Sequence, residues 1–117
     1  MKDQRFIGTG VAIITPFRNN EIDYPALGNI IDYVINGGVN YIVALGSTGE
    51  TATLNETEAR EVLDYCIQKI NNRVPLVAGN FGWNDTKELC RKIKEYDFSN
   101  IAAILSSSPA YVKPSQE

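Results

Sequence analysis

Short apolar runs recur along the chain and alternate with longer segments in which apolar residues keep a helical spacing. The runs are continuous rather than strictly alternating, which is typical of strands buried on both faces. They predict strands over residues Gly8–Phe17, Tyr41–Leu45, Val74–Gly79 and Ile101–Leu105.

The three segments between these runs each begin with a recognisable helix start. Asp23–Pro25 opens the first, with proline suited to the first helical turn. Gly37-Gly38 ends it, since glycine takes the left-handed position after a helix without strain. The second and third starts, Asn55–Glu58 and Asp85–Glu88, carry Asn or Asp followed three residues later by Glu, which is the spacing of a capping box.

The element order is therefore βαβαβαβ, which predicts an α/β fold with right-handed crossovers and a parallel sheet. Two architectures fit this order: an open doubly wound sheet, or about half of a (β/α)8 barrel, since a whole barrel takes about 250 residues. The periodicity does not choose between them. The pattern finishes on a strand, a polar loop and a helix start at Pro114-Ser115, which favours an incomplete barrel.

Composition excludes several classes of protein. The chain has 117 residues, of which 44% are hydrophobic and 21% charged, so we expect a globular fold rather than disorder. The net charge is −3 and no basic tract is present, which argues against binding to nucleic acid or to an anionic membrane. No apolar run is long enough to span a bilayer, and the N-terminus lacks the apolar core of a signal peptide, so we expect a cytoplasmic protein.

The absence of histidine narrows the chemistry. It removes the commonest general base and the commonest zinc ligand, and we expect no metal ion. We also expect no cofactor. Catalysis must use carboxylate, hydroxyl, phenol, lysine or backbone groups. Cys66 and Cys90 fall on or near the apolar faces of helical patterns, so we expect both to be buried, reduced thiols.

The stretch Gly46-Ser47-Thr48-Gly49-Glu50 follows the second strand and is the clearest candidate site. Hydroxyls beside glycine amides suit a carboxylate or a phosphate, although such residues also serve as ordinary caps. The stretch lacks the Gly-Lys ending of a P-loop. For Glu50 we expect a helix-capping role over a general-base role. For Lys113, in a polar loop, we expect solvation over Schiff-base chemistry.

Four motifs, in order along the whole chain, resemble the dihydrodipicolinate synthase / N-acetylneuraminate lyase family. They are Gly8–Phe17, Gly46–Glu50 followed by Ala52–Leu54, Val74–Gly79, and Pro109–Glu117. The last two motifs resemble the dihydrodipicolinate synthase branch in particular.

The resemblance implies a (β/α)8 barrel, of which residues 1–117 would be the N-terminal half of a single domain with the remainder absent. It also implies a homo-oligomer made of two tight dimers. The family's reaction is class I aldolase-like and belongs to lysine and diaminopimelate biosynthesis. Pyruvate forms a Schiff base with a lysine, and the resulting enamine attacks L-aspartate semialdehyde.

Residue roles follow from the same resemblance. Ser47 and Thr48 would hold the pyruvate carboxylate, and Thr48 would also join a proton relay. Tyr111 would reach across the tight dimer into the neighbouring site. Asn84 and Glu88 match the cleft through which lysine inhibits members of the family.

The chain departs from the family pattern in three ways. The Schiff-base lysine lies on a later strand and matches no position here, and Lys113 is not that lysine. Ser47 stands where dihydrodipicolinate synthases commonly carry threonine. Serine at this position is common in N-acetylneuraminate lyases. Ala110 replaces a tyrosine that many members place in the lysine cleft, and the histidine-bearing positions of that cleft, near Glu56 and Ala59, are not matched either. This departure argues against feedback inhibition by lysine.

Two alternatives therefore stay open. One is an N-acetylneuraminate lyase or another pyruvate-dependent aldolase, which shares the pyruvate half-reaction and differs in the acceptor. The other is a small flavodoxin-like module, complete in itself, that binds an anion at Ser47-Thr48.

Overall fold

The computed structural model describes residues 2–79, 81, 84–109, 111 and 115. The strands are β1 (Gly10–Ala12), β2 (Phe17–Arg18), β3 (Glu21–Ile22), β4 (Tyr41–Ala44), β5 (Leu76–Ala78) and β6 (Ala103–Ile104). The α-helices are α1 (Tyr24–Asn36), α2 (Glu56–Ile70) and α3 (Thr86–Glu95), and short 3-10 helices cover Gln4–Phe6 and Thr51–Thr53.

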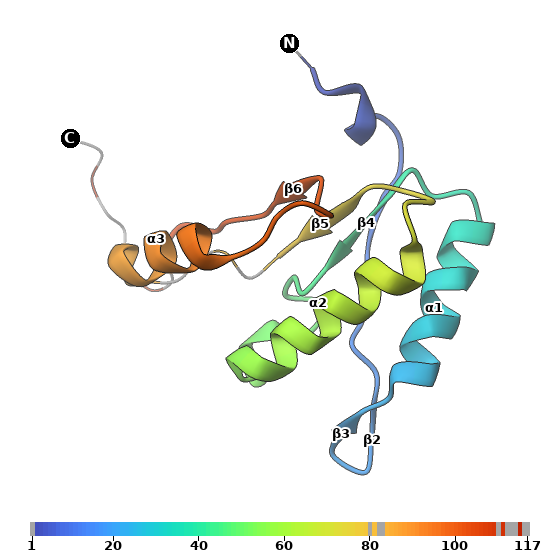
Figure 1. Cartoon of the computed structure of the whole chain (residues 1–117), viewed down its shortest axis with the longest axis horizontal. Helices are drawn as coiled ribbons and strands as arrows, with labels where there is room; N and C mark the ends of the chain where they lie inside the picture. The colour runs from blue at the N-terminus through green and yellow to red at the C-terminus, as the bar shows by residue number, and fades with distance from the viewer. Residues whose placement is uncertain (1, 80, 82–83, 110, 112–114, 116–117) are drawn as a thin grey trace.

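The main sheet has four parallel strands in the order β1-β4-β5-β6, the order in which they occur in the chain. Open doubly wound sheets, including the flavodoxin-like type, reverse direction at a switch point, and this sheet does not. Right-handed crossovers between strands that advance in one direction place their helices on one face. Figure 1 shows α1 and α2 side by side across the same face of the sheet. The strand order therefore contradicts the flavodoxin-like alternative.

The three helix starts are confirmed. Asp23 Oδ1 accepts from Ala26 N–H at 3.0 Å. Asn55 and Glu58 form a full capping box, with both hydrogen bonds at 2.9 Å. Asp85 Oδ1 accepts from the first-turn N–H groups of α3 at 2.9 and 3.3 Å.

A single core lies between the sheet and helices α1 and α2. Register places Val11, Ile42 and Leu76 in one row, and Ala44, Ala78 and Ile104 in the next row on that face. The largest fully buried side chains are Leu27, Ile31, Ile42, Leu63, Ile70, Val62 and Cys66. Burial of each large aliphatic side chain contributes about 1.5–3 kcal/mol relative to exposure, so this layer supplies the main stabilisation of the sheet.

The opposite face of the sheet carries apolar side chains as well. Ala12, Val43, Val77 and Ala103 share a register row, and alternation along each strand turns this row away from the helices. Near its ends Ile14 is 51% exposed and Leu105 is 53% exposed. An apolar inner face of this kind is expected of strands that line a barrel interior.

The apolar runs overestimated the length of the strands. The first run was predicted to be one strand to Phe17, which is wrong, because the pairing of β1 ends before Pro16 and Phe17 instead pairs with Ile22 in a hairpin. Asn19 and Asn20 form its turn with φ of 51° and 63°, and asparagine tolerates this left-handed region well. Among the described helices, none is long and apolar enough to cross a membrane.

The two cysteines differ, contrary to the prediction that both are buried. Cys66 is fully buried in the core, whereas Cys90 is exposed on α3. The prediction for Cys90 is wrong because none of the residues of α3 is buried, so its apolar positions only border the core. Burial raises the pKa of the Cys66 thiol to about 12.

We predict that iodoacetamide at pH 8 modifies Cys90 alone in the folded protein. The thiolate is the reactive species, and burial keeps Cys66 protonated and out of reach. Mass analysis should show one adduct in native buffer and two in denaturant. A Cys90→Ser variant serves as the control and should show no native adduct. Labelling of Cys66 at the rate of Cys90 would contradict the structure.

A second prediction concerns Asp32, which joins α1 to the C-terminal end of α2. Its carboxylate pairs with Lys69 Nζ at 2.7 Å and Arg73 Nη2 at 2.8 Å. The hydrogen bond from Lys69, and then that from Arg73, lowers the pKa of Asp32. A lowered folded-state pKa stabilises the fold above the unfolded value of about 3.9, and this contribution is lost as pH falls through the lower folded value.

An Asp32→Asn variant should therefore have a lower urea midpoint than the parent at pH 7, and the difference should shrink at pH 2–3. Asp64→Asn is the matched control, because Asp64 is an exposed aspartate of α2 with no ion pair among the residues the structure describes. An Asp32→Asn difference that stays constant across this pH range would contradict the assignment.

Candidate functional site

The polar loop after β4 turns the chain from the sheet into α2. Gly49 N–H donates to Gly46 C=O at 3.0 Å, and Glu50 N–H donates to Ser47 C=O at 3.0 Å, so the loop closes on itself. Ser47 and Thr48 lie at its exposed crest. Because parallel strands end at the same edge, this crest lies where α/β folds bind ligands.

Two residues that flank the crest adopt the left-handed conformation. Leu45 has φ of 60° and Glu50 has φ of 56°. For a bulky residue such as leucine this conformation is strained, and strained backbone of this kind concentrates at functional sites. Leu45 is nevertheless buried, with 4% of its surface exposed, so packing holds it in place.

The start of the next loop presses against Leu45. A Cβ atom added at Gly79 would lie 2.4 Å from Leu45 O and 2.7 Å from Gly46 N, so only glycine fits there. Gly79 N–H donates to Ala44 C=O at 2.7 Å, which extends the pairing of β4 with β5 past the end of both strands. The two loops are therefore fixed to each other.

The backbone N–H groups of Ser47 and Thr48 donate to no other described residue. Two consecutive amides that no described residue accepts from, with hydroxyls beside them, can bind a carboxylate. Within the part of the chain that the structure describes, no group of His, Cys, Asp or Glu could hold a metal ion.

Glu50 was expected to cap the helix that follows, and this is wrong. It precedes the 3-10 helix Thr51–Thr53, and its side chain makes no capping hydrogen bond. Its left-handed backbone places it in a turn, and its carbonyl accepts from Thr53 N–H at 2.9 Å and Thr53 Oγ1 at 2.8 Å. The capping role belongs instead to Asn55, five residues further along.

The predicted site residues fall into two groups. A cleft of about 430 Å³ brings Ser47 together with Asn84 and Glu88, between the loops that follow β4, β5 and β6. Thr48 and Tyr111 are not among the described residues that line it. Tyr111 is fully exposed with φ of 63°. Lys113 and Ala110 lie outside the described residues.

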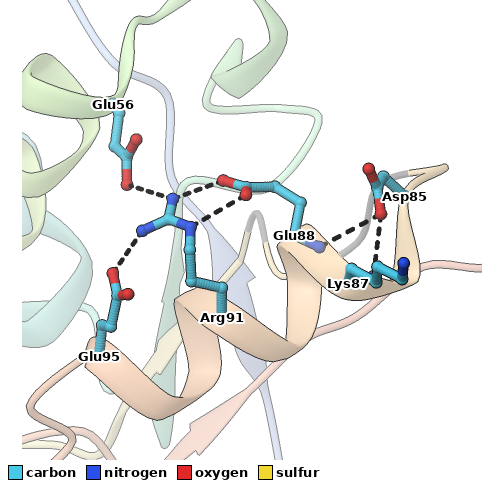
Figure 2. Close-up of polar contacts among 6 residues, drawn as sticks. All are labelled: Glu56, Asp85, Lys87, Glu88, Arg91 and Glu95. Atoms are coloured by element: carbon cyan, nitrogen blue, oxygen red, sulfur yellow. Dashed lines mark hydrogen bonds and ion pairs between the residues drawn. The ribbon is translucent and has the colours of Figure 1, made fainter.

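Sequence reasoning missed the ion-pair cluster centred on Arg91, which Figure 2 shows. Arg91 Nε donates to Glu88 Oε2 at 2.9 Å, Arg91 also pairs with Glu95, and its Nη2 lies 3.7 Å from Glu56 Oε1. Glu88 and Glu95 stand three and four residues from Arg91, a spacing visible in the sequence. Glu56 belongs to α2, so that pair could be found only in the fold.

Electrostatics at Glu88 follow from this cluster. The hydrogen bond from Arg91 lowers the pKa of Glu88, so the carboxylate is charged at neutral pH. The same hydrogen bond raises the pKa of Arg91. Because Glu56 and Glu88 line the cleft that contains Ser47, Arg91 holds a wall of this cleft together.

Comparison with known proteins agrees with this geometry. Residues 5–117 match the profile of the Dihydrodipicolinate synthetase family. The chain is 48% identical over 115 residues to 4-hydroxy-tetrahydrodipicolinate synthase of Flavobacterium psychrophilum, covering 97% of the chain and 39% of that protein. It is 44% identical over 118 residues to the synthase of Parabacteroides distasonis, again covering 39% of the relative.

Solved structures show the same relation. Dihydrodipicolinate synthase from Aquifex aeolicus superposes with a TM-score of 0.84 at 35% identity, over 93% of this chain and 37% of that one. The Thermotoga maritima enzyme superposes with a TM-score of 0.88 at 31% identity, over 96% and 38%. The chain thus spans well under half of the length of the relatives it matches, and its fold is part of a (β/α)8 barrel. It belongs to the dihydrodipicolinate synthetase family.

Proposed function

We propose that residues 1–117 are the N-terminal half of a single-domain (β/α)8 barrel enzyme that condenses pyruvate with L-aspartate semialdehyde, as a 4-hydroxy-tetrahydrodipicolinate synthase does. The observation that carries this proposal is the pair of amides at Ser47 and Thr48, which have no partner among the described residues and stand beside two hydroxyls. The identity to synthases over nearly the whole chain supports the choice of reaction.

In this proposal the chain supplies the binding half of the active site. Pyruvate loses its keto oxygen as water when it forms a Schiff base with a lysine located outside these residues. The Ser47 and Thr48 amides hold the carboxylate, so the methyl group is oriented for loss of a proton to give the enamine. The enamine carbon then attacks the aldehyde carbon of L-aspartate semialdehyde.

The proton relay involves two further groups. The hydroxyl of Thr48 is exposed at the crest of the loop and can pass a proton between a phenol and the reacting atoms. The fully exposed ring of Tyr111 supports a role outside its own chain, in the site of a neighbouring subunit. We therefore propose that the complete protein is a homo-oligomer, arranged as a dimer of dimers. We also propose that it acts in the cytoplasm.

We predict that the 117-residue chain alone forms no borohydride-trapped adduct with pyruvate, because it lacks the nucleophilic lysine. The complete barrel protein should form one adduct and condense pyruvate with L-aspartate semialdehyde. A Thr48→Val variant keeps the side-chain shape and should reduce turnover about a hundredfold if the hydroxyl relays protons.

The experiment has two informative controls. A hybrid with residues 1–117 in place of the matching part of the Flavobacterium psychrophilum relative tests this chain independently of its own continuation. Cleavage of sialic acid in place of the condensation would favour the N-acetylneuraminate lyase alternative, which the serine at position 47 also suits. Pyruvate trapping on the isolated chain would contradict the proposal.

We also propose that Asn84 and Glu88 line a regulatory cleft for lysine. The Glu88 carboxylate is the natural partner for an effector ammonium, but Arg91 already occupies it in a two-point ion pair. An incoming ammonium must compete with that guanidinium. This competition supports weak inhibition by lysine.

An Arg91→Gln variant of the complete protein should therefore be inhibited by L-lysine at lower concentration than the parent, because Glu88 is released. Lys94→Gln is the matched control, since it removes one positive charge from the same helix without touching Glu88. Inhibition curves for the three proteins test this directly. Equal curves for the Arg91→Gln variant and the parent would count against a role for Glu88.

A further inference from the structure

Thr15 is the one buried polar side chain among the residues that the structure describes, with 4% of its surface exposed. It stands three residues after β1, the strand that pairs with β4. A buried hydroxyl is costly unless it is hydrogen-bonded. The hydrogen-bond acceptor of this hydroxyl therefore indicates the role of Thr15.

The partner is the loop that carries Ser47 and Thr48. Thr15 Oγ1 donates to Gly49 C=O at 2.7 Å, linking residues 34 positions apart in the chain. The N–H of the same Gly49 donates to Gly46 C=O at 3.0 Å. Gly49 is thus held on one side by the segment that follows β1 and on the other by the start of its own loop.

Packing around Gly49 leaves the loop little freedom. A Cβ atom at this position would lie 3.2 Å from Leu45 N and 3.3 Å from Ile13 O, tighter than ordinary contact. The strained φ values of Leu45 and Glu50 lie immediately before and after the crest. Strain of this kind persists only where surrounding contacts over-determine the conformation. The Thr15 hydroxyl supplies such a contact at the end of the loop opposite to Gly79.

We propose that Thr15 is a positioning residue for 2-keto-acid binding, whose hydroxyl fixes Gly49 so that the amides of Ser47 and Thr48 point at the ligand carboxylate. The inference rests on the proposed function for the identity of the ligand. Thr15 is not among the residues lining the cleft, and its effect passes through the loop backbone. Loss of the Thr15 hydroxyl should therefore weaken binding of the keto acid, while the reaction with the acceptor aldehyde is preserved.

The test compares Thr15→Val with Thr15→Ser in the complete protein. Valine keeps the shape and removes the donor, whereas serine keeps the donor. We expect Thr15→Val to raise the KM for pyruvate roughly five- to tenfold, the effect of one hydrogen bond, with kcat and the KM for the aldehyde within about twofold. Thr15→Ser should restore the parent value. Thr15→Ala, which leaves room for a water on Gly49 C=O, is the second variant if the valine protein folds poorly.

A second readout does not depend on the reaction. Amide hydrogen exchange at Gly49 and Glu50 should be faster in Thr15→Val than in Thr15→Ser, while the amide of Leu63 in α2 is unchanged. Proportional losses in kcat and both KM values, or uniform exchange across the chain, would show a purely structural role and overturn the inference. A parent protein that lacks condensation while these exchange differences persist would overturn the proposed function alone.

Discussion

The position of every polar loop in this chain depends on the parallel pairing of β4 with β1 on one side and β5 on the other. Register aligns Ala12, Val43 and Val77 in one row, so the three strands end at a common edge. A slip of one residue would turn Ile42 away from the helices and expose it on the opposite face. Burial of Ile42 therefore stabilises the core. By fixing the register of β4, it also fixes where the loop that carries Ser47 begins relative to the neighbouring strands.

The loop after β4 combines rigid packing and an exposed crest within a few residues. Leu45 and Gly49 are buried, and the first is left-handed, whereas Ser47 and Thr48 between them are exposed. The buried pair anchors the loop and leaves the two amides without a partner among the described residues. Preorganised donors of this kind bind an anion without first giving up hydrogen bonds of their own.

Features that depend on residues close together in the sequence could be predicted from it, whereas features that depend on contacts between distant segments could not. Helix starts at Asp23, Asn55 and Asp85 were predictable because a cap is made within three residues. The class of fold also followed, but the choice of a barrel over an open sheet needed the observed strand order or a family resemblance. The residues that would hold a keto acid came from that resemblance, and the structure adds the conformation of their loop.

The failures share a physical cause. The exposure of Cys90 depends on how far α3 stands from the core, which its own spacing does not encode. The turn at Glu50 depends on Thr15 and Gly79, which lie in the segments that follow the two neighbouring strands β1 and β5. The ion pair between Arg91 and Glu56 joins two helices and has no local signature.

The consecutive strand order has a consequence for synthesis. Among the described residues, each strand of the main sheet pairs only with the preceding and the following strand of that sheet, so none of these contacts has to wait for a strand further along the chain. Folding rates rise when contacts close short loops. On the ribosome, β1, α1 and β4 can associate as soon as they emerge, and each later strand finds its neighbour already in place. The loop after β4 is then assembled early, long before the opposite wall of a barrel would be made.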